Sequence, residues 1–169
     1  MRPAAVLFAL LLGCSGGKDT ADTSEPPAPG TSGNQDCGDT PPAIEDMVIS
    51  DYGFFQCEAV EWPSILIQTQ VSDSDGDLTY YTKQLWWDTT IDGVVDPSGS
   101  PLESQKTLSE TPCSTSQADL GLILCITGAP PYSTEVEFGV VVFDADGNPS
   151  NNGVPTVATF TTPDENGNY

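Results

Sequence analysis

Histidine is absent from this 169-residue chain, and basic residues are scarce: four lysines and arginines stand against 25 aspartates and glutamates. Without an imidazole, the chain cannot build a Ser-His-Asp or Cys-His catalytic site or a histidine-ligated metal site. The net charge of −21 repels phosphate backbones and anionic head groups, so we expect no nucleic-acid partner. The partners that suit this charge are cations, neutral glycans and proteins with basic patches.

Long hydrophobic runs are also missing. The longest, residues 4–12 (AAVLFALLL), has nine residues, far fewer than the ~20 that a membrane-spanning helix needs. Because Met1 and Arg2 precede it, the run is typical of the apolar region of an export signal. This segment therefore takes no part in the expected fold.

The end of the run, residues 11–14 (LLGC), resembles the lipobox of bacterial lipoproteins. The resemblance implies that residues 1–13 are a signal peptide and that Cys14 begins the mature chain and carries diacylglycerol. Two or three acyl chains anchor a protein stably to a membrane, whereas one binds only marginally. The implied location is the bacterial cell envelope, and Ser15 favours the outer membrane. The alternative is an ordinary cleaved signal that leaves a reactive thiol at Cys14.

Residues 15–36 contain alanine as their only aliphatic type and are otherwise dominated by Ser, Thr, Gly, Pro, Asp and Glu. Such a segment cannot bury enough apolar surface to offset the entropy of ordering. We therefore expect residues 14–36 to form a lipidated, disordered tether. A domain at residues 37–163 and a short C-terminal tail at residues 164–169 follow.

From Cys37 onward, short runs with alternating apolar and polar residues are separated by turn residues, and no amphipathic helix is evident. Residues 64–71 (SILIQTQV) and 135–143 (EVEFGVVVF) alternate most clearly. Seven short strands in one domain indicate an all-β fold, a single antiparallel β-sandwich. The strands are expected at residues 44–49, 64–71, 78–87, 102–108, 118–126, 135–143 and 154–162.

Two segments, VSDSDGDLTYY (71–81) and VVVFDADGNPSN (140–151), resemble turns of bacterial Ig-like, cadherin-like and polycystic-kidney-disease-type repeats. The resemblance implies an Ig-like sandwich whose strands take the letters A to G in chain order. The four cysteines of the domain and the tandem tryptophans depart from these families, which leaves the subfamily open.

Four cysteines remain for the domain once Cys14 is set aside, and they allow three pairings. In the lettered sandwich, Cys37 and Cys113 share one end and Cys57 and Cys125 share the other. The sequence therefore predicts the bonds Cys37–Cys113 and Cys57–Cys125. A local pairing of Cys37 with Cys57 and of Cys113 with Cys125 stays open.

A repeated pattern, Asp-x-Asp-Gly-Asp and Asp-x-Asp-Gly-Asn, offers a candidate cation site. Oxygen side chains on two tight turns can converge on Ca²⁺, which takes six to eight oxygen ligands. The alternative is that these residues only form turns, because Asp and Asn bond their own backbone and Asp-Gly is a turn dipeptide. We expect no required cofactor, and the candidate Ca²⁺ ligands are Asp73, Asp75, Asp77, Asp144, Asp146 and Asn148.

Tryptophans next to each other on a strand face opposite sides, so either Trp86 or Trp87 points outward or lies under a loop. Together with Tyr81, they are candidate ligand-facing aromatics for a sugar or a partner protein. The sequence thus predicts a non-catalytic, lipid-anchored envelope module for binding or structure, with a membrane, glycan or envelope-protein partner. The alternatives are a carbohydrate-binding module and a small envelope enzyme that uses a carboxylate pair.

Overall fold

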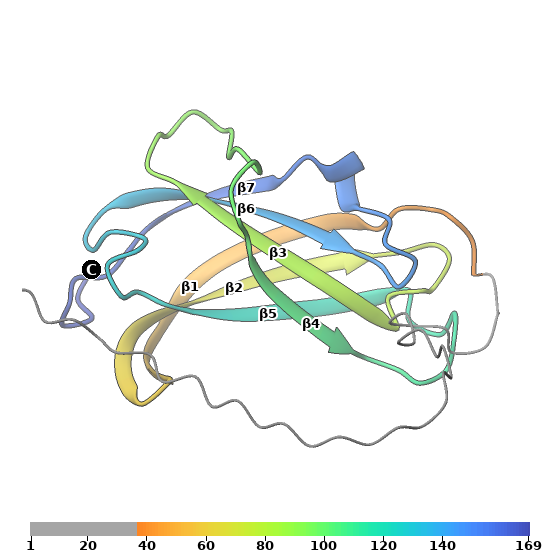
Figure 1. Cartoon of the computed structure of the whole chain (residues 1–169), viewed down its shortest axis with the longest axis horizontal. Coiled ribbons are helices and arrows are strands. Elements are labelled where there is room, and N and C mark those ends of the chain that lie inside the picture. The colour runs from red at the N-terminus through yellow and green to blue at the C-terminus, as the bar shows by residue number, and fades with distance from the viewer. Residues whose placement is uncertain (1–36) are drawn as a thin grey trace, which may run out of the picture. The chain divides into compact units, whose positions relative to one another are not determined.

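The computed structural model describes residues 37–169, which fold as two antiparallel sheets packed face to face (Figure 1). One sheet has the order β1-β2-β5 and the other β4-β3-β6-β7. This arrangement confirms the all-β sandwich of seven strands. The elements are β1 (Ala43–Cys57), β2 (Val60–Ser72), β3 (Tyr80–Asp88), β4 (Leu102–Thr107), β5 (Gln117–Cys125), β6 (Glu135–Phe143), the 3₁₀ turn η1 (Ser150–Gly153) and β7 (Thr156–Thr161).

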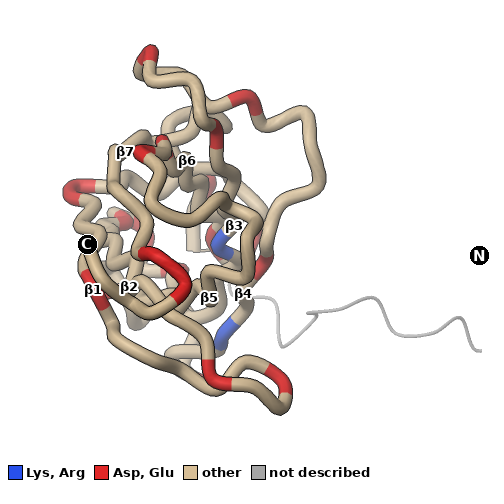
Figure 2. The backbone as a smooth tube through the Cα atoms, turned by 90° about the vertical axis from the view of Figure 1, so that its left-hand side faces the viewer, with Lys and Arg blue, Asp and Glu red and all other residues tan. Residues whose placement is uncertain are grey.

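The signal peptide, Cys14 and the tether lie outside the described residues. Within residues 37–169, no helix is long and apolar enough to cross a membrane. Acidic residues are spread over the domain, while Lys83 and Lys106 are the two basic residues in this part of the chain (Figure 2).

Alternation along β2 and β6 builds the core between the sheets. Every second residue on one face of each strand is buried: Ile65, Ile67, Thr69 and Val71 in β2, and Val136, Phe138, Val140 and Val142 in β6. This confirms the two most regular strand predictions. The core cluster consists of Ile65, Ile67, Val71, Leu78, Tyr81, Leu85, Leu120, Leu124, Ile126, Val136, Phe138, Val140 and Val142.

Lys83 lies in this core and is completely buried. Its Nζ donates hydrogen bonds to the carbonyl oxygens of Ile67 at 3.0 Å and Leu120 at 2.9 Å, both in the opposite sheet. Burial lowers the pKa of this amine to about 7. The lysine therefore joins the two sheets through main-chain acceptors, without a carboxylate partner.

The outer face of the four-stranded sheet is partly covered by the β3–β4 connection, residues 89–101. Trp86 and Val141 pack there against Val95, and Trp86 Nε1 donates to the Gly99 carbonyl at 3.0 Å. A Cβ on Gly139 would lie 2.8 Å from Val95 Cβ, so glycine is needed for this close approach. Both faces of β6 are consequently buried.

The fourth strand is not where the letter D would place it. In the constant-type immunoglobulin arrangement strand D lies in the sheet of A, B and E, but β4 pairs with β3. The connection folds back over the outer face of β3's own sheet, so the chain emerges at that sheet's free edge. The first strand is also longer than expected, because a register shift between Asp51 and Gly53 lets it continue to Cys57.

Two disulfides close opposite ends of the sandwich. Cys37 bonds Cys113 with a Cα–Cα distance of 5.4 Å, and Cys57 bonds Cys125 with a distance of 6.5 Å. The pairing predicted from topology is confirmed, and the local alternative is excluded.

The C-terminal tail returns to the sandwich after β7. Tyr169 Oη donates to Asp51 Oδ1 at 3.0 Å, and its ring meets Phe160 edge to face at 5.7 Å. The tail therefore packs on the side where β1 and β7 lie close together.

Candidate metal centre

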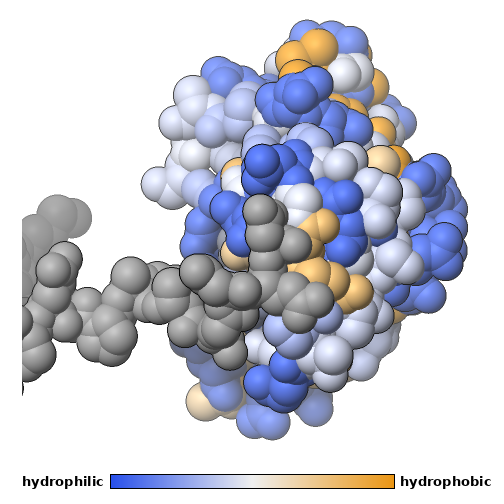
Figure 3. Space-filling model, turned by 90° about the vertical axis from the view of Figure 1, so that its right-hand side faces the viewer, coloured by the Kyte–Doolittle hydropathy of each residue, from blue (hydrophilic) through white to orange (hydrophobic). Residues whose placement is uncertain are grey.

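Three connections meet at the end of the sandwich where Cys37 lies. The β2–β3 loop bonds the β4–β5 connection through Asp73 N to the Ser116 carbonyl at 2.9 Å and Thr115 N to the Gly76 carbonyl at 2.8 Å. It contacts the β6–β7 loop through Ala145 N, which donates to the Asp77 carbonyl at 3.3 Å. Figure 3 shows this end from outside, where hydrophilic residues cover most of the surface.

One oxygen of Asp73 and one of Asp144 hold their own loops in shape. Asp73 Oδ1 accepts the backbone N–H groups of Asp75 at 2.8 Å and Gly76 at 2.9 Å. Asp144 Oδ1 accepts those of Asp146 at 3.0 Å and Asn148 at 2.7 Å. These are turn-forming contacts of the ordinary Asx kind. The turn interpretation therefore accounts for the Oδ1 atoms of Asp73 and Asp144, but not for their Oδ2 atoms.

The remaining oxygens converge. Asp73, Asp77 and Asp144 each place one carboxylate oxygen within 4.8 Å of the other two. All three residues are at most 3% exposed. Asp73 Oδ2, Asp144 Oδ2 and both oxygens of Asp77 are buried without a hydrogen-bond partner among the described residues. A buried charged oxygen without a partner is energetically costly. The cluster therefore needs a compensating positive charge.

Two of these carboxyl groups, those of Asp77 and Asp144, have raised pKa values. Burial, then the negative charges of Asp144 and Asp73, raise the pKa of Asp77 to about 7. Burial also raises the pKa of Asp144, although the backbone N–H of Asn148 opposes that change. Lys83 cannot neutralise the site, because its ammonium bonds main-chain carbonyls in the core. A cation among the three carboxylates would supply the missing charge.

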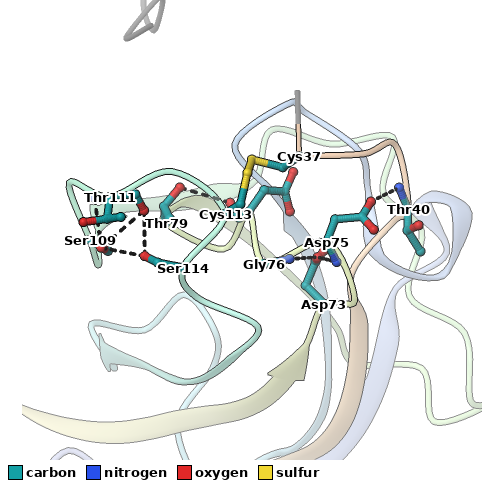
Figure 4. The surroundings of a disulfide bond; sticks show 11 residues. Cys37, Thr40, Asp73, Asp75, Gly76, Thr79, Ser109, Thr111, Cys113 and Ser114 are labelled. Carbon is teal, nitrogen blue, oxygen red and sulfur yellow. Dashed lines mark hydrogen bonds between the residues drawn. A yellow bond between two sulfur atoms is a disulfide. The ribbon is translucent and has the colours of Figure 1, made fainter. Parts of the chain in front are cut away.

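Three of the six expected ligands are thus brought together, and three are not. Asp75 Oδ2 instead accepts the backbone N–H of Thr40 at 2.6 Å, which lowers the pKa of Asp75 (Figure 4). Asp146 is exposed, and the Asn148 amide only opposes the rise that burial causes in the pKa of Asp144. The tight turns direct their first residues inward and their third residues outward, which spacing alone did not distinguish.

The start of the domain is fastened to this site. Figure 4 shows the Cys37–Cys113 disulfide beside the Asp73 turn, with Thr40 next to Asp75. A Cβ on Gly76, whose φ is 79°, would lie 2.7 Å from the Cys113 carbonyl oxygen. Glycine is therefore required where the ligand loop contacts the disulfide-bonded segment.

A third copy of the turn pattern, Asp164-x-Asn166-Gly167-Asn168, escaped the sequence reasoning although its spacing is the same. Asp164 Oδ1 accepts the backbone N–H groups of Asn166 and Asn168, both at 2.8 Å. Its Oδ2 accepts Asn168 Nδ2 at 3.1 Å. Both oxygens accept hydrogen bonds within the turn, and Asp164 is not part of the carboxylate cluster, so this loop serves as an internal comparison.

The expected ligand-facing aromatics do not gather on one surface. Tyr81 is in phase with Lys83 and lies in the core, and Trp86 lies under the β3–β4 connection. Trp87 alone reaches solvent, with 37% of its surface exposed. Strand alternation places Tyr80, which is 38% exposed, on the opposite face from Tyr81.

No protein family matches this chain, and no curated protein matches it.

Proposed function

We propose that this domain is a non-catalytic, Ca²⁺-binding β-sandwich module of a lipid-anchored protein of the bacterial cell envelope. The observation that carries the cation proposal is the set of four buried, unpartnered carboxylate oxygens on Asp73, Asp77 and Asp144. They come from two loops about 70 residues apart in the chain, so local turn formation does not account for their meeting.

Ligand chemistry favours Ca²⁺ over other metals. The three side chains offer only carboxylate oxygens, which suit hard cations, whereas zinc and copper prefer imidazole or thiolate. Ca²⁺ accepts irregular coordination by six to eight oxygens, while Mg²⁺ demands a near-octahedral set and keeps its waters. Loop carboxylates completed by main-chain oxygens or water fit the less demanding ion.

A structural role follows from where the ligands lie. Asp73 and Asp77 belong to the loop that passes from one sheet to the other, and Asp144 directly follows β6. An ion at this point would tie the two sheets together. The same burial argues against these three carboxylates serving the alternative of an envelope enzyme, because a substrate cannot reach oxygens that have no exposed surface.

Calorimetric titration of the full chain with Ca²⁺ and with Mg²⁺ tests the site. We expect tighter binding of Ca²⁺ and a gain of about 2.7 kcal/mol in unfolding free energy at a hundred times Kd. Asp144→Asn keeps a turn-closing oxygen but removes a charged ligand, so it should weaken Ca²⁺ binding about tenfold or more.

Asp164→Asn is the matched control, because it makes the same change in the third turn and should leave Ca²⁺ affinity unaltered. Equal Ca²⁺ affinity in the wild type and Asp144→Asn, or no heat and no stabilisation at millimolar Ca²⁺, would contradict the proposed site.

Support for the envelope anchor comes from the lipobox-like residues and from two disulfides, which persist in exported proteins. We expect labelled palmitate to be incorporated in bacteria that process lipoproteins, and Cys14→Ser to move the protein from the membrane fraction to the soluble fraction. Unchanged fractionation of Cys14→Ser would rule out the lipid anchor.

A further inference from the structure

A shallow hollow of about 310 Å³, wide open to solvent, lies on the outer face of the four-stranded sheet, beside the β6–β7 loop. We call it the Tyr80 hollow. The β3–β4 connection covers Trp86 and Val141 further along the same face. The part of the face that stays open is lined chiefly by Tyr80, Thr82, Gln84, Phe143 and Asp146.

The side chains that line the Tyr80 hollow come from two neighbouring strands, β3 and β6, and from the loop that follows β6. Tyr80, Thr82 and Gln84 are every second residue of β3 and share one face, and Thr82 lies opposite Phe143 in the ladder. The hollow therefore offers two aromatic side chains, a hydroxyl and an amide, with an exposed carboxylate at Asp146. Aromatic faces with a few placed hydrogen-bonding groups are what small polar ligands need.

Cross-strand hydrogen bonds hold these side chains in place before any ligand arrives. Tyr80 Oη donates to Gln105 Oε1 at 2.8 Å, and Gln84 Nε2 donates to Glu103 Oε1 at 2.6 Å. Side chains that are already ordered lose less conformational entropy on binding. Because its hydroxyl is held, the ring of Tyr80 is already positioned for a ligand to stack on it.

Charge narrows the class of ligand. No basic residue lines the hollow, so an anionic ligand would meet only carboxylates. A basic peptide would need several free carboxylates, but Asp144 is buried, Glu103 beside the hollow already accepts the Gln84 amide, and Asp146 is the exposed carboxylate of the lining. A neutral ligand with apolar C–H faces and many hydroxyls matches rings, amide and a single carboxylate acceptor.

We propose that the Tyr80 hollow binds a neutral oligosaccharide chain. Its sugar rings stack on Tyr80 and Phe143, and its hydroxyls bond Thr82, Gln84 and Asp146. The proposal does not rest on the cation site, because backbone N–H groups hold the Asp144 turn whether or not an ion is bound.

The test is titration of the full chain with four neutral hexasaccharides: cellohexaose, laminarihexaose, maltohexaose and chitohexaose. We expect at least one to bind in the presence of Ca²⁺, and Tyr80→Ala to weaken that binding about tenfold, the loss of one stacked aromatic ring. Trp87→Ala is the matched control, because Trp87 has nearly the same exposure but lies near the other end of β3.

Three outcomes would overturn the proposal. They are binding of no hexasaccharide, binding that Tyr80→Ala leaves unchanged, and binding that Trp87→Ala removes instead. In the first case, binding of deca-lysine that Asp146→Asn abolishes would assign the hollow to a basic peptide. Repeating the sugar titration with Asp144→Asn separates the two sites: sugar binding that survives loss of Ca²⁺ supports the hollow whatever becomes of the cation proposal.

Discussion

Asp77→Asn is expected to stabilise the cation-free protein at pH 8 and to abolish its stabilisation by Ca²⁺. Burial and the neighbouring carboxylates raise the pKa of Asp77 from 3.8 to about 7. Between these two pH values the folded state keeps a proton that the unfolded state has released, so stability falls as pH rises. The full shift corresponds to about 4 kcal/mol. Relaxation of the loops and penetration of water around the charged group offset part of this, which leaves about 2 kcal/mol.

Urea unfolding followed by tryptophan fluorescence measures this effect at pH 4 and at pH 8, in cation-free buffer and, at pH 8, also with Ca²⁺. The variant should gain about 2 kcal/mol over the wild type at pH 8 without cation and almost nothing at pH 4. With saturating Ca²⁺ the order should reverse. A variant destabilised equally with and without Ca²⁺, together with a flat wild-type stability between pH 4 and pH 8, would refute the argument.

Three further predictions concern the rest of the fold. Burial depresses the folded-state pKa of Lys83 from 10.5 to about 7, so stability is lost as pH falls between these values; Lys83→Met should add about 2 kcal/mol at pH 6 and flatten that dependence in urea titrations. Replacing Cys57 and Cys125 together with serine should cost about 4 kcal/mol, with unchanged Ca²⁺ affinity by calorimetry. Gly139→Ala should lower the melting temperature through a cost of about 1–3 kcal/mol, which Val95→Ala in the same chain should partly relieve.

Strand alternation correctly predicted which residues of a single strand face the core. In β2, Ile65, Ile67 and Val71 occupy alternate positions on one face and are fully buried. The disulfide pairing followed from topology at the same level, because which end of the sandwich a cysteine occupies depends only on the order of the strands.

What could not be predicted depends on contacts between distant segments. Lys83 breaks the alternation of its strand, and only the two carbonyls of the facing sheet explain its burial. Trp86 is buried by the connection that follows its own strand, which no periodicity reveals. In the metal centre, Asp75 looks equivalent to Asp73 and Asp77 in the sequence, but Thr40 draws its carboxylate away from the other two.

The Cys37–Cys113 bond has a mechanical consequence. The residues between the two cysteines, which include β1 to β4, form a closed covalent loop with a sequence separation of 76. Tension applied between the two ends of the chain passes through the sulfurs and cannot stretch that loop. The Cys57–Cys125 bond links this protected loop to the end of β5. Of the described residues, those after Cys113, with β5, β6 and β7, lie outside that loop and are left to extend, so a pulled molecule would lose its C-terminal strands first while β1 to β4 stay held.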